Sequence, residues 1–165
     1  MRRLALPVAV LGLFFVPVGG LPVAGYLRGI GGDLSVTTLL LLASTVVAYA
    51  GGPRLHERRD LQTLAAIVLA GALFLYPMSL GLTSFDPYAL GYPLHVRSLL
   101  LGLVPVGLFA WFRGGVLVPV VLAAALAAFR FELFESSNLW DYLLDPWLTL
   151  YLAGFTIFAR FSKSR

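Results

Sequence analysis

The sequence contains no cysteine, which excludes a disulfide framework, a thiolate metal site and a cysteine nucleophile. It holds only two histidines, His56 and His95, and the topology derived below puts them on opposite sides of a membrane. A histidine-based metal site is therefore not expected. The P-loop, H-E-x-x-H and G-x-S-x-G motifs are missing too. We expect no metal and no cofactor.

Charge is also scarce, because charged residues make up 12% of the chain and hydrophobic residues 59%. Soluble domains carry about twice that share of charge. The mean hydropathy is +0.89, and a water-soluble domain of this size could not bury so much apolar surface. The net charge of +4 does not indicate nucleic-acid binding, because the basic residues are spread between apolar runs. Composition therefore predicts an all-α integral membrane protein.

Most of the chain lies in stretches without Asp, Glu, Lys, Arg or His. These are residues 4–27, 34–53, 61–85, 98–112, 114–129 and 146–159. In hydrocarbon a helix is the simplest way to pair every backbone polar group. We predict about six transmembrane helices, with a tight turn at Arg113 and short interfacial helices on the outer side, in one polytopic domain over residues 1–165. Spans without charge disfavour a proton pump or a voltage sensor.

The first stretch permits two interpretations. Arg2 and Arg3, followed by an apolar run and small residues up to Gly25, are also typical of a cleaved secretory signal. The run continues past an ordinary signal core, so we expect the N-terminus to be retained. Prolines and glycines between positions 17 and 22 then break the helix, and its last part is expected at the outer surface.

Orientation follows from Lys and Arg, which are in excess in cytoplasmic loops. With a cytoplasmic N-terminus, that side receives Arg2, Arg3, Arg54, Arg58, Arg59, Arg113, Arg160, Lys163 and Arg165. The outer side receives Arg28, Arg97 and Arg130, with most of the acidic residues. The sequence therefore predicts a multi-pass protein of the bacterial inner (plasma) membrane with both termini cytoplasmic.

Aspartates precede several expected helices: Asp33, Asp60, Asp86 and Asp145. Proline follows Asp86 and Asp145, and proline is favoured at the first helical position while Asp caps the turn before it. We interpret these aspartates as helix caps. Catalysis or ion binding is the alternative.

Residues 138–141 have the pattern of a capping-box variant, in which Asn138 is the cap and Asp141 reaches back to it. The pattern predicts a short helix over residues 139–144. We expect it to lie along the membrane, with Trp140 and Tyr142 at headgroup level.

The outer ionisable groups without an obvious local role are Glu132, Glu135, His95, Arg97 and Arg130. On a helix, Glu132 and Glu135 would share a face, where two carboxylates could share a proton or hold a cation. They and His95 are the catalytic candidates, whereas the arginines could bind an anionic headgroup or phosphate. We expect Glu132, Glu135, Arg97 and Arg130 to converge. Interfacial ion pairs are the alternative.

Other ligand- or partner-binding candidates on the outer side are Asp86, Tyr88, Tyr92, Asn138, Trp140 and Asp141. Their aromatic rings fit an interfacial belt, or an aromatic-lined cleft for a lipid headgroup, a glycan or a quinone. On the cytoplasmic side, His56 belongs to a basic loop. This loop sets the topology or binds anionic lipid.

These features favour a non-catalytic subunit or assembly factor of a membrane complex, whose partners are membrane lipid and another membrane protein. One alternative is an enzyme acting at the outer face on a lipid-linked or anionic substrate, with Glu132 or Glu135 as general base. The other is a small-molecule carrier or flippase, in which Pro105 and Pro119 open a path.

Overall fold

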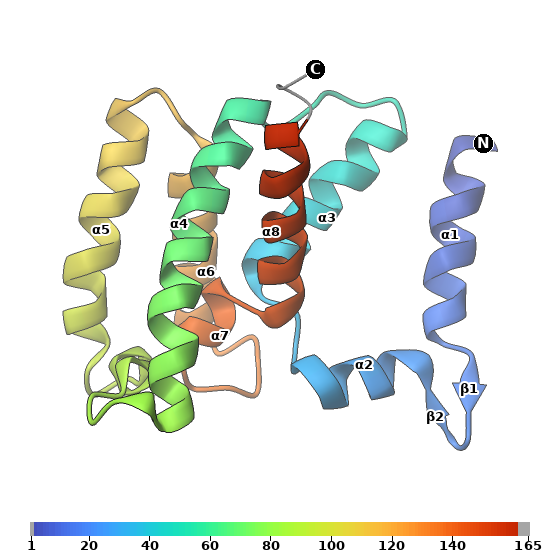
Figure 1. Ribbon diagram of the computed structural model, residues 1–165. Helices are drawn as coiled ribbons and strands as arrows, with labels where there is room; N and C mark the ends of the chain where they lie inside the picture. The colour runs from blue at the N-terminus through green and yellow to red at the C-terminus, as the bar shows by residue number, and fades with distance from the viewer. Residues whose placement is uncertain (1, 162–165) are drawn as a thin grey trace.

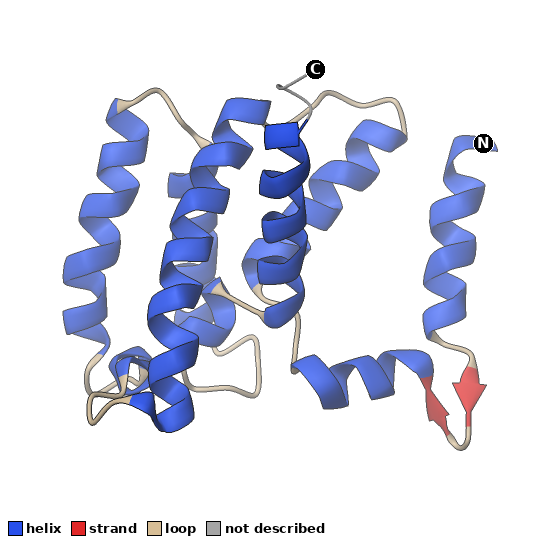
Figure 2. Ribbon diagram, viewed as in Figure 1, coloured by secondary structure: helices blue, strands red, loops and turns tan. Residues whose placement is uncertain are grey.

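Helices account for most of the chain, as its apolar runs predict (Figures 1 and 2). The computed structural model describes residues 2–161 and, among these, every side chain except those of residues 2–4, 6 and 7. The side chains of Arg2 and Arg3, and all of Lys163 and Arg165, which entered the topology prediction, lie outside this described part.

The elements follow one another with short connections. The α-helices are α1 (Arg2–Phe14), α2 (Val23–Gly31), α3 (Val36–Tyr49), α4 (Arg58–Pro77), α5 (Val96–Phe112), α6 (Leu117–Arg130), α7 (Leu139–Leu143) and α8 (Pro146–Phe161). A π-helix, η1 (Met78–Leu82), continues α4, and a 3-10 helix, η2 (Pro87–Gly91), precedes α5. The strands β1 (Pro17–Val18) and β2 (Leu21–Pro22) pair antiparallel.

Within residues 2–161, one helix is long and apolar enough to cross a membrane. It is α4 with its continuation η1, Arg58–Leu82, with 25 residues and a mean hydropathy of 2.0. The helices α3, α5 and α6 are apolar but shorter. A single helix of this kind is weak support for a membrane location, because the core helix of a soluble protein can have the same length and composition. The structure therefore confirms the all-α class and leaves the number of spans a proposal.

The helices α1, α3, α4, α5, α6 and α8 run up and down the view of Figure 1, so the loops gather at two ends. The upper end, which holds both termini, comprises residues 50–60, 112–117 and 158–161, and we call it the basic end for its arginines. The lower end comprises residues 28–35, 78–97 and 130–147, and we call it the acidic end.

The break predicted between positions 17 and 22 is confirmed, and it takes the form of a β-hairpin. Gly19 and Gly20 have φ angles of 58° and 92°, which glycine adopts at little cost. The Tyr26 hydroxyl donates to the Val18 carbonyl oxygen at 2.7 Å and ties α2 to the hairpin. In Figure 1, α2 runs across the lower end between the hairpin and the bundle, and α1 stands at the side of the bundle, where it contacts α3.

The interior of the bundle is built around α6, against which α3, α4, α5 and α7 all pack. Ala125 on α6 is fully buried, as are Leu139 and Tyr142 on α7 and Leu152 on α8. The turn predicted at Arg113 is confirmed: α5 ends there, and Gly114, with a φ of 80°, turns the chain into α6.

Candidate functional site

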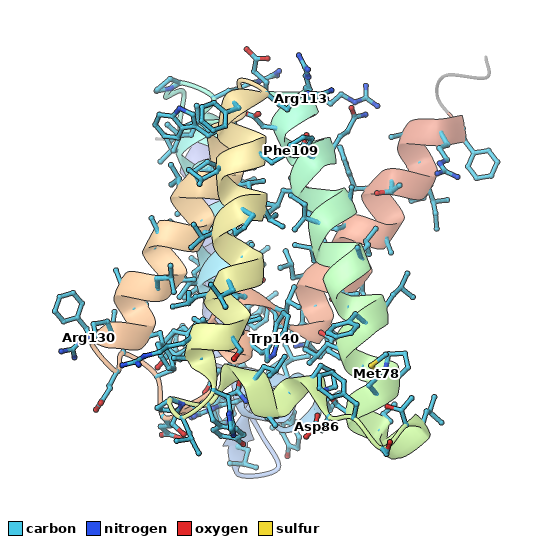
Figure 3. The ribbon with its side chains drawn as sticks, turned by 90° about the vertical axis from the view of Figure 1, so that its left-hand side faces the viewer. Met78, Asp86, Phe109, Arg113, Arg130 and Trp140 are labelled. Carbon is cyan, nitrogen blue, oxygen red and sulfur yellow. The ribbon has the colours of Figure 1, made fainter. Side chains whose placement is uncertain are left out.

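The acidic end contains the outer residues singled out in the sequence. Figure 3 shows Asp86, Arg130 and Trp140 toward this end, with Arg113 at the other. Its chemistry depends on which polar groups are free to bind a ligand and which already form hydrogen bonds within the chain.

Asp145 is bonded within the chain, with 3% of its surface exposed. Its Oδ1 accepts a hydrogen bond from the Leu148 backbone N–H at 2.8 Å, which confirms the predicted cap of α8. Its Oδ2 accepts from the Ser35 backbone N–H at 2.9 Å, from the Ser35 hydroxyl at 2.7 Å and from the Thr38 hydroxyl. These donors compensate the burial of the carboxylate. Asp145 therefore joins the starts of α3 and α8.

Of the other three predicted aspartate caps, one is confirmed and two are wrong. Asp86 caps η2 by accepting the Tyr88 backbone N–H at 2.9 Å, as predicted. The prediction for Asp33 is wrong, because Ser35 caps α3. The prediction for Asp60 is also wrong, because α4 begins before its apolar run, with Glu57 at the N-cap position, and Asp60 lies in the first turn.

Asn138 is fully buried and caps α7, as predicted. Its Oδ1 accepts the Trp140 backbone N–H at 2.9 Å, and its Nδ2 donates to the Tyr88 carbonyl oxygen at 2.9 Å. The Trp140 Nε1 donates to the Pro87 carbonyl oxygen at 2.9 Å. Gly91 lies directly against Asn138, so that any side chain there would overlap with the amide. Together these contacts dock α7 onto η2.

The capping box predicted with Asp141 is wrong. The Asp141 carboxylate accepts hydrogen bonds from the Tyr88 hydroxyl at 2.8 Å and from the Ser136 hydroxyl, while the Asn138 backbone N–H donates to Ser136 Oγ at 3.0 Å. Burial, followed by the hydrogen bond to Asp141, raises the pKa of Tyr88. Tyr88 therefore stays protonated as a donor. Its ring meets Tyr92 edge-on at a centroid distance of 5.7 Å.

The helix predicted over residues 139–144 is confirmed in position by α7, but its exposed interfacial placement is wrong. Trp140 is 6% exposed and Tyr142 is fully buried. The Tyr142 ring stacks on Phe134 at a centroid distance of 4.6 Å, and its hydroxyl donates to the Ser136 carbonyl oxygen at 3.0 Å. The loop after α6 therefore covers this helix.

Glu135 forms an ion pair, but not with the predicted arginines. Its Oε2 lies 3.0 Å from Arg28 Nη2, and Arg28 Nε lies 2.7 Å from Asp33 Oδ1. All three side chains are substantially exposed. One cation is thus shared between two carboxylates, and it links α2 to the loop after α6.

The shared helix face predicted for Glu132 and Glu135 is wrong, because α6 ends at Arg130 and the residues after it form a turn and loop. Glu132 has a φ of 52°. The side chains of His95, Arg97, Arg130 and Glu132 are exposed and make no hydrogen bond or ion pair with another residue in the described part of the chain. No contact links them into a catalytic cluster.

A lateral groove that the sequence analysis missed lies between α1 and α2 on one side and α3 and α8 on the other. It has a volume of 650 Å³ and is lined by apolar side chains such as Phe14, Leu42 and Tyr151, with Arg28 and Asp33 at the acidic end. Figure 1 shows the separation of α1 from the bundle. No sequence signal locates this groove, because it depends on the angle at which α2 leaves the hairpin.

Sequence reasoning also missed the Ser35–Asp145 and Gly91–Asn138 contacts. Ser35 stands out only as a polar residue at the start of an apolar run. Comparison of the chain with protein-family models, with curated proteins and with solved structures gives no match.

Proposed function

We propose that the chain is a polytopic inner-membrane protein with about six spans, and that it serves a membrane complex as a non-catalytic subunit or assembly factor. Its apolar surface supports a membrane location. Only 28% of the most apolar window of α4 is buried, although a core helix of a soluble protein would be mostly covered. Leu73, Leu101 and Phe158 are each more than three-quarters exposed, as expected of side chains that face lipid.

The alternating directions of the long helices and the separation of charge between the two ends support the proposed orientation, with the basic end in the cytoplasm. Reporter fusions active only outside the membrane should be silent after Arg165 and active after Asp86. An active reporter at the C-terminus would refute this orientation.

The hydrogen bonds of the acidic end argue for a non-catalytic role. Asp86, Asp141 and Asp145 accept hydrogen bonds from within the chain, and Glu135 binds Arg28. An enzyme needs a base that can reach the substrate together with groups that stabilise developing charge, and these carboxylates hold the fold together instead.

The lateral groove is the observation that carries the proposed function. Apolar side chains line it along α3 and α8, and Phe14 at the end of α1 lines it from the other side. Only a helix satisfies its own backbone polar groups at membrane depth. The charged end of the groove holds Arg28 with two carboxylates, Asp33 and Glu135. We therefore assign the groove to a membrane helix of a partner protein that carries Lys or Arg near its outer end.

Site-specific photocrosslinking in native membranes tests this assignment. A photoreactive residue at Leu42, in the groove, should give one discrete adduct with another protein, whereas the same residue at Leu101, exposed on α5, should not. Glu135→Lys should weaken the adduct because it reverses the attractive charge. Glu132→Lys is the matched control, since Glu132 has no ion-pair partner among the described residues.

An adduct that is equally strong at both positions, or equally affected by both charge reversals, would refute the groove as the docking site. An adduct with the mass of two copies of this chain would assign the groove to self-association instead. Adducts with lipid alone would remove the support for a partner helix.

A further inference from the structure

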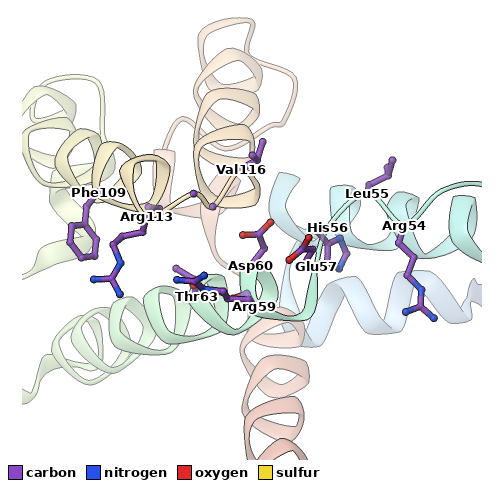
Figure 4. Close-up of a pocket in the computed structure, with 13 residues that line it drawn as sticks. Arg54, Leu55, His56, Glu57, Arg59, Asp60, Thr63, Phe109, Arg113 and Val116 are labelled. Atoms are coloured by element: carbon purple, nitrogen blue, oxygen red, sulfur yellow. The ribbon is translucent and has the colours of Figure 1, made fainter.

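The basic end opens into a hollow of 720 Å³ between the loop before α4, the start of α4, the end of α5 and the turn that follows α5. Figure 4 shows the residues that line it, among them Arg54, His56, Glu57, Arg59, Asp60, Thr63, Phe109 and Arg113. Arg59, Thr63, Phe109 and Arg113 gather on one side in this view, and Arg54 lies on the other.

The arginines of this hollow are not neutralised by ion pairs. Arg54, Arg59 and Arg113 form none with any residue that the structure describes. The guanidinium carbon of Arg113 lies 5.6 Å from the centre of the Phe109 ring. The carboxylates of Glu57 and Asp60 also line the hollow. Because the three arginines outnumber them, the hollow has a net positive charge.

Two further features favour an anion there. The Nδ1 atom of His56 is buried and has no hydrogen-bond partner within the described residues. The helices α4 and α6 both begin at this end, and neither has a side-chain cap. Their first backbone N–H groups therefore add positive potential to that of the arginines.

A second hollow, of 390 Å³ and almost entirely apolar, lies one helical turn further along α4 and α5. On α4, Thr63 of the first hollow is followed one turn later by Ile67 of the second, and then by Gly71. On α5, Ala110 is likewise followed by Val106 one turn away. We call the two hollows together the α4–α5 cleft. Its length from Thr63 to Gly71 is about 12 Å by the helical rise.

The cleft exists because α4 and α5 pack on α6 rather than on each other. Gly71 and Gly102 keep it open by lacking side chains, and a Cβ added at Gly102 would meet no other atom within 4 Å. At its acidic end Trp140 and Leu144 close the cleft. An α-helix with its side chains is about 10–12 Å across, which is too wide for an interior of this volume, whereas a single hydrocarbon chain is not.

We propose that the α4–α5 cleft binds one anionic phospholipid from the leaflet at the basic end. Its phosphate lies between Arg59 and Arg113, whose guanidinium groups lie on the same side of the hollow and match phosphate in charge and geometry. One acyl chain lies in the apolar interior between Ile67 and Val106. Basic pockets between membrane helices on the cytoplasmic side suit such headgroups. The site rests on the membrane location proposed above, but not on the partner helix.

Quenching of Trp140 tests the site in the full-length chain, because Trp140 lines the end of the cleft. Replacing Trp111 and Trp147 by Phe leaves it as the sole tryptophan. The protein is reconstituted into phosphatidylcholine vesicles that contain a small fraction of phosphatidylglycerol or phosphatidylcholine with brominated acyl chains. Bromine quenches an indole that it approaches closely. We expect brominated phosphatidylglycerol to quench Trp140 at contents where brominated phosphatidylcholine does not.

Matched variants distinguish recognition of the lipid headgroup from binding of the acyl chain. Arg113→Gln should weaken the apparent affinity for phosphatidylglycerol roughly fivefold. Arg160→Gln should not, because Arg160 lies at the same end of the bundle but outside the cleft. Gly102→Leu should fill the interior and abolish the quenching. Gly154→Leu, at another open helical position, should leave it unchanged.

Equal quenching by the two brominated lipids, or full quenching in Gly102→Leu, would overturn the lipid site while leaving the proposed membrane location intact. If neither brominated lipid quenches the exposed Trp111 in a variant that keeps it as the sole tryptophan, the membrane location fails and this site fails with it. Loss of the partner adduct at the lateral groove would not affect either result.

Discussion

Asp145 at the acidic end accepts hydrogen bonds from α3 and α8, whereas Arg59 and Arg113 at the basic end pair with no carboxylate among the described residues. The acidic end uses its polar side chains to fix backbone: Asn138 and Trp140 bind carbonyl oxygens of η2. The basic end leaves its cations exposed around a hollow. A concentration of aromatic and charged residues in the sequence can therefore mark a structural contact, whereas the proposed lipid site lies in a segment whose sequence indicates only membrane topology.

The contrast predicts that the loss of stability on removing a carboxylate at the acidic end depends on how deeply that carboxylate is buried. Asp145→Ala leaves the donors of Ser35, Thr38 and Leu148 without their acceptor, so we expect a loss of at least about 3 kcal/mol in the free energy of unfolding. Asp86→Ala is the matched control, because Asp86 also precedes a proline but is exposed and accepts one backbone N–H as a cap. It should lose about 1 kcal/mol. Thermal unfolding in mild detergent measures both, and equal losses would contradict the assignment.

Glycine at the acidic end and glycine in the α4–α5 cleft should behave differently as well. Gly91→Ala places a methyl group in the position of the Asn138 amide, so α7 must shift away from η2, and we expect a loss of about 2 kcal/mol. Gly102→Ala puts the same methyl group into open space within a helix. It should be neutral or stabilising by up to about 1 kcal/mol, because alanine loses less backbone entropy on folding. Comparable destabilisation of both variants would show that the contact of α7 with η2 is no more tightly packed than the α4–α5 cleft.

Several local signals in the sequence predicted local structure correctly, whereas the caps expected at Asp33 and Asp60 and the capping box with Asp141 were wrong. The Asp-Pro pairs at 86 and 145 are caps, and the break between positions 17 and 22 and the turn at Arg113 lie where glycine and proline predicted them. The start of α4 was missed because Arg58 and Arg59 are charged, although both are good helix formers. Hydropathy alone therefore placed the helix boundary too late.

The contacts that decide the site could not be predicted. Ser35 and Asp145 are 110 residues apart, and Glu135 is 107 residues from its partner Arg28. No periodicity or motif specifies such pairs, because they depend on how α2 and α8 are oriented after the chain has folded. The burial of Tyr142 was missed for the same reason: an aromatic residue beside a membrane boundary has the same sequence pattern whether it faces lipid or the interior of the bundle.

Removing the Tyr88 hydroxyl should reduce stability by a smaller amount, and this loss should depend on pH. Tyr88→Phe removes the donor to Asp141, and we expect a loss of about 1 kcal/mol near neutral pH. Because the pKa of Tyr88 is raised above its ordinary value of 10.0, the folded state holds this proton more tightly than the unfolded state. The stabilisation is complete below the unfolded pKa and is lost as pH rises through the folded pKa.

Unfolding midpoints of the unmodified chain and of Tyr88→Phe should therefore differ at neutral pH and converge above about pH 10. Tyr49→Phe is the control, since Tyr49 is 46% exposed and its hydroxyl forms no hydrogen bond with another described residue. A difference that grows with pH would contradict the role of Tyr88 as donor.

The smallest effect on stability is expected at the basic end. Arg113→Gln removes a charge that has no ion-pair partner among the described residues and only a cation–π contact with Phe109. We expect the free energy of unfolding to change by no more than about 0.5 kcal/mol, as for most exposed substitutions. The same variant should weaken binding of anionic lipid, so a substitution at this end changes binding without changing stability. No such variant exists for Asp145, because its carboxylate is needed for folding. Thermal unfolding without added anionic lipid measures the first quantity, and a large loss there would place Arg113 among the structural residues and remove the contrast between the two ends.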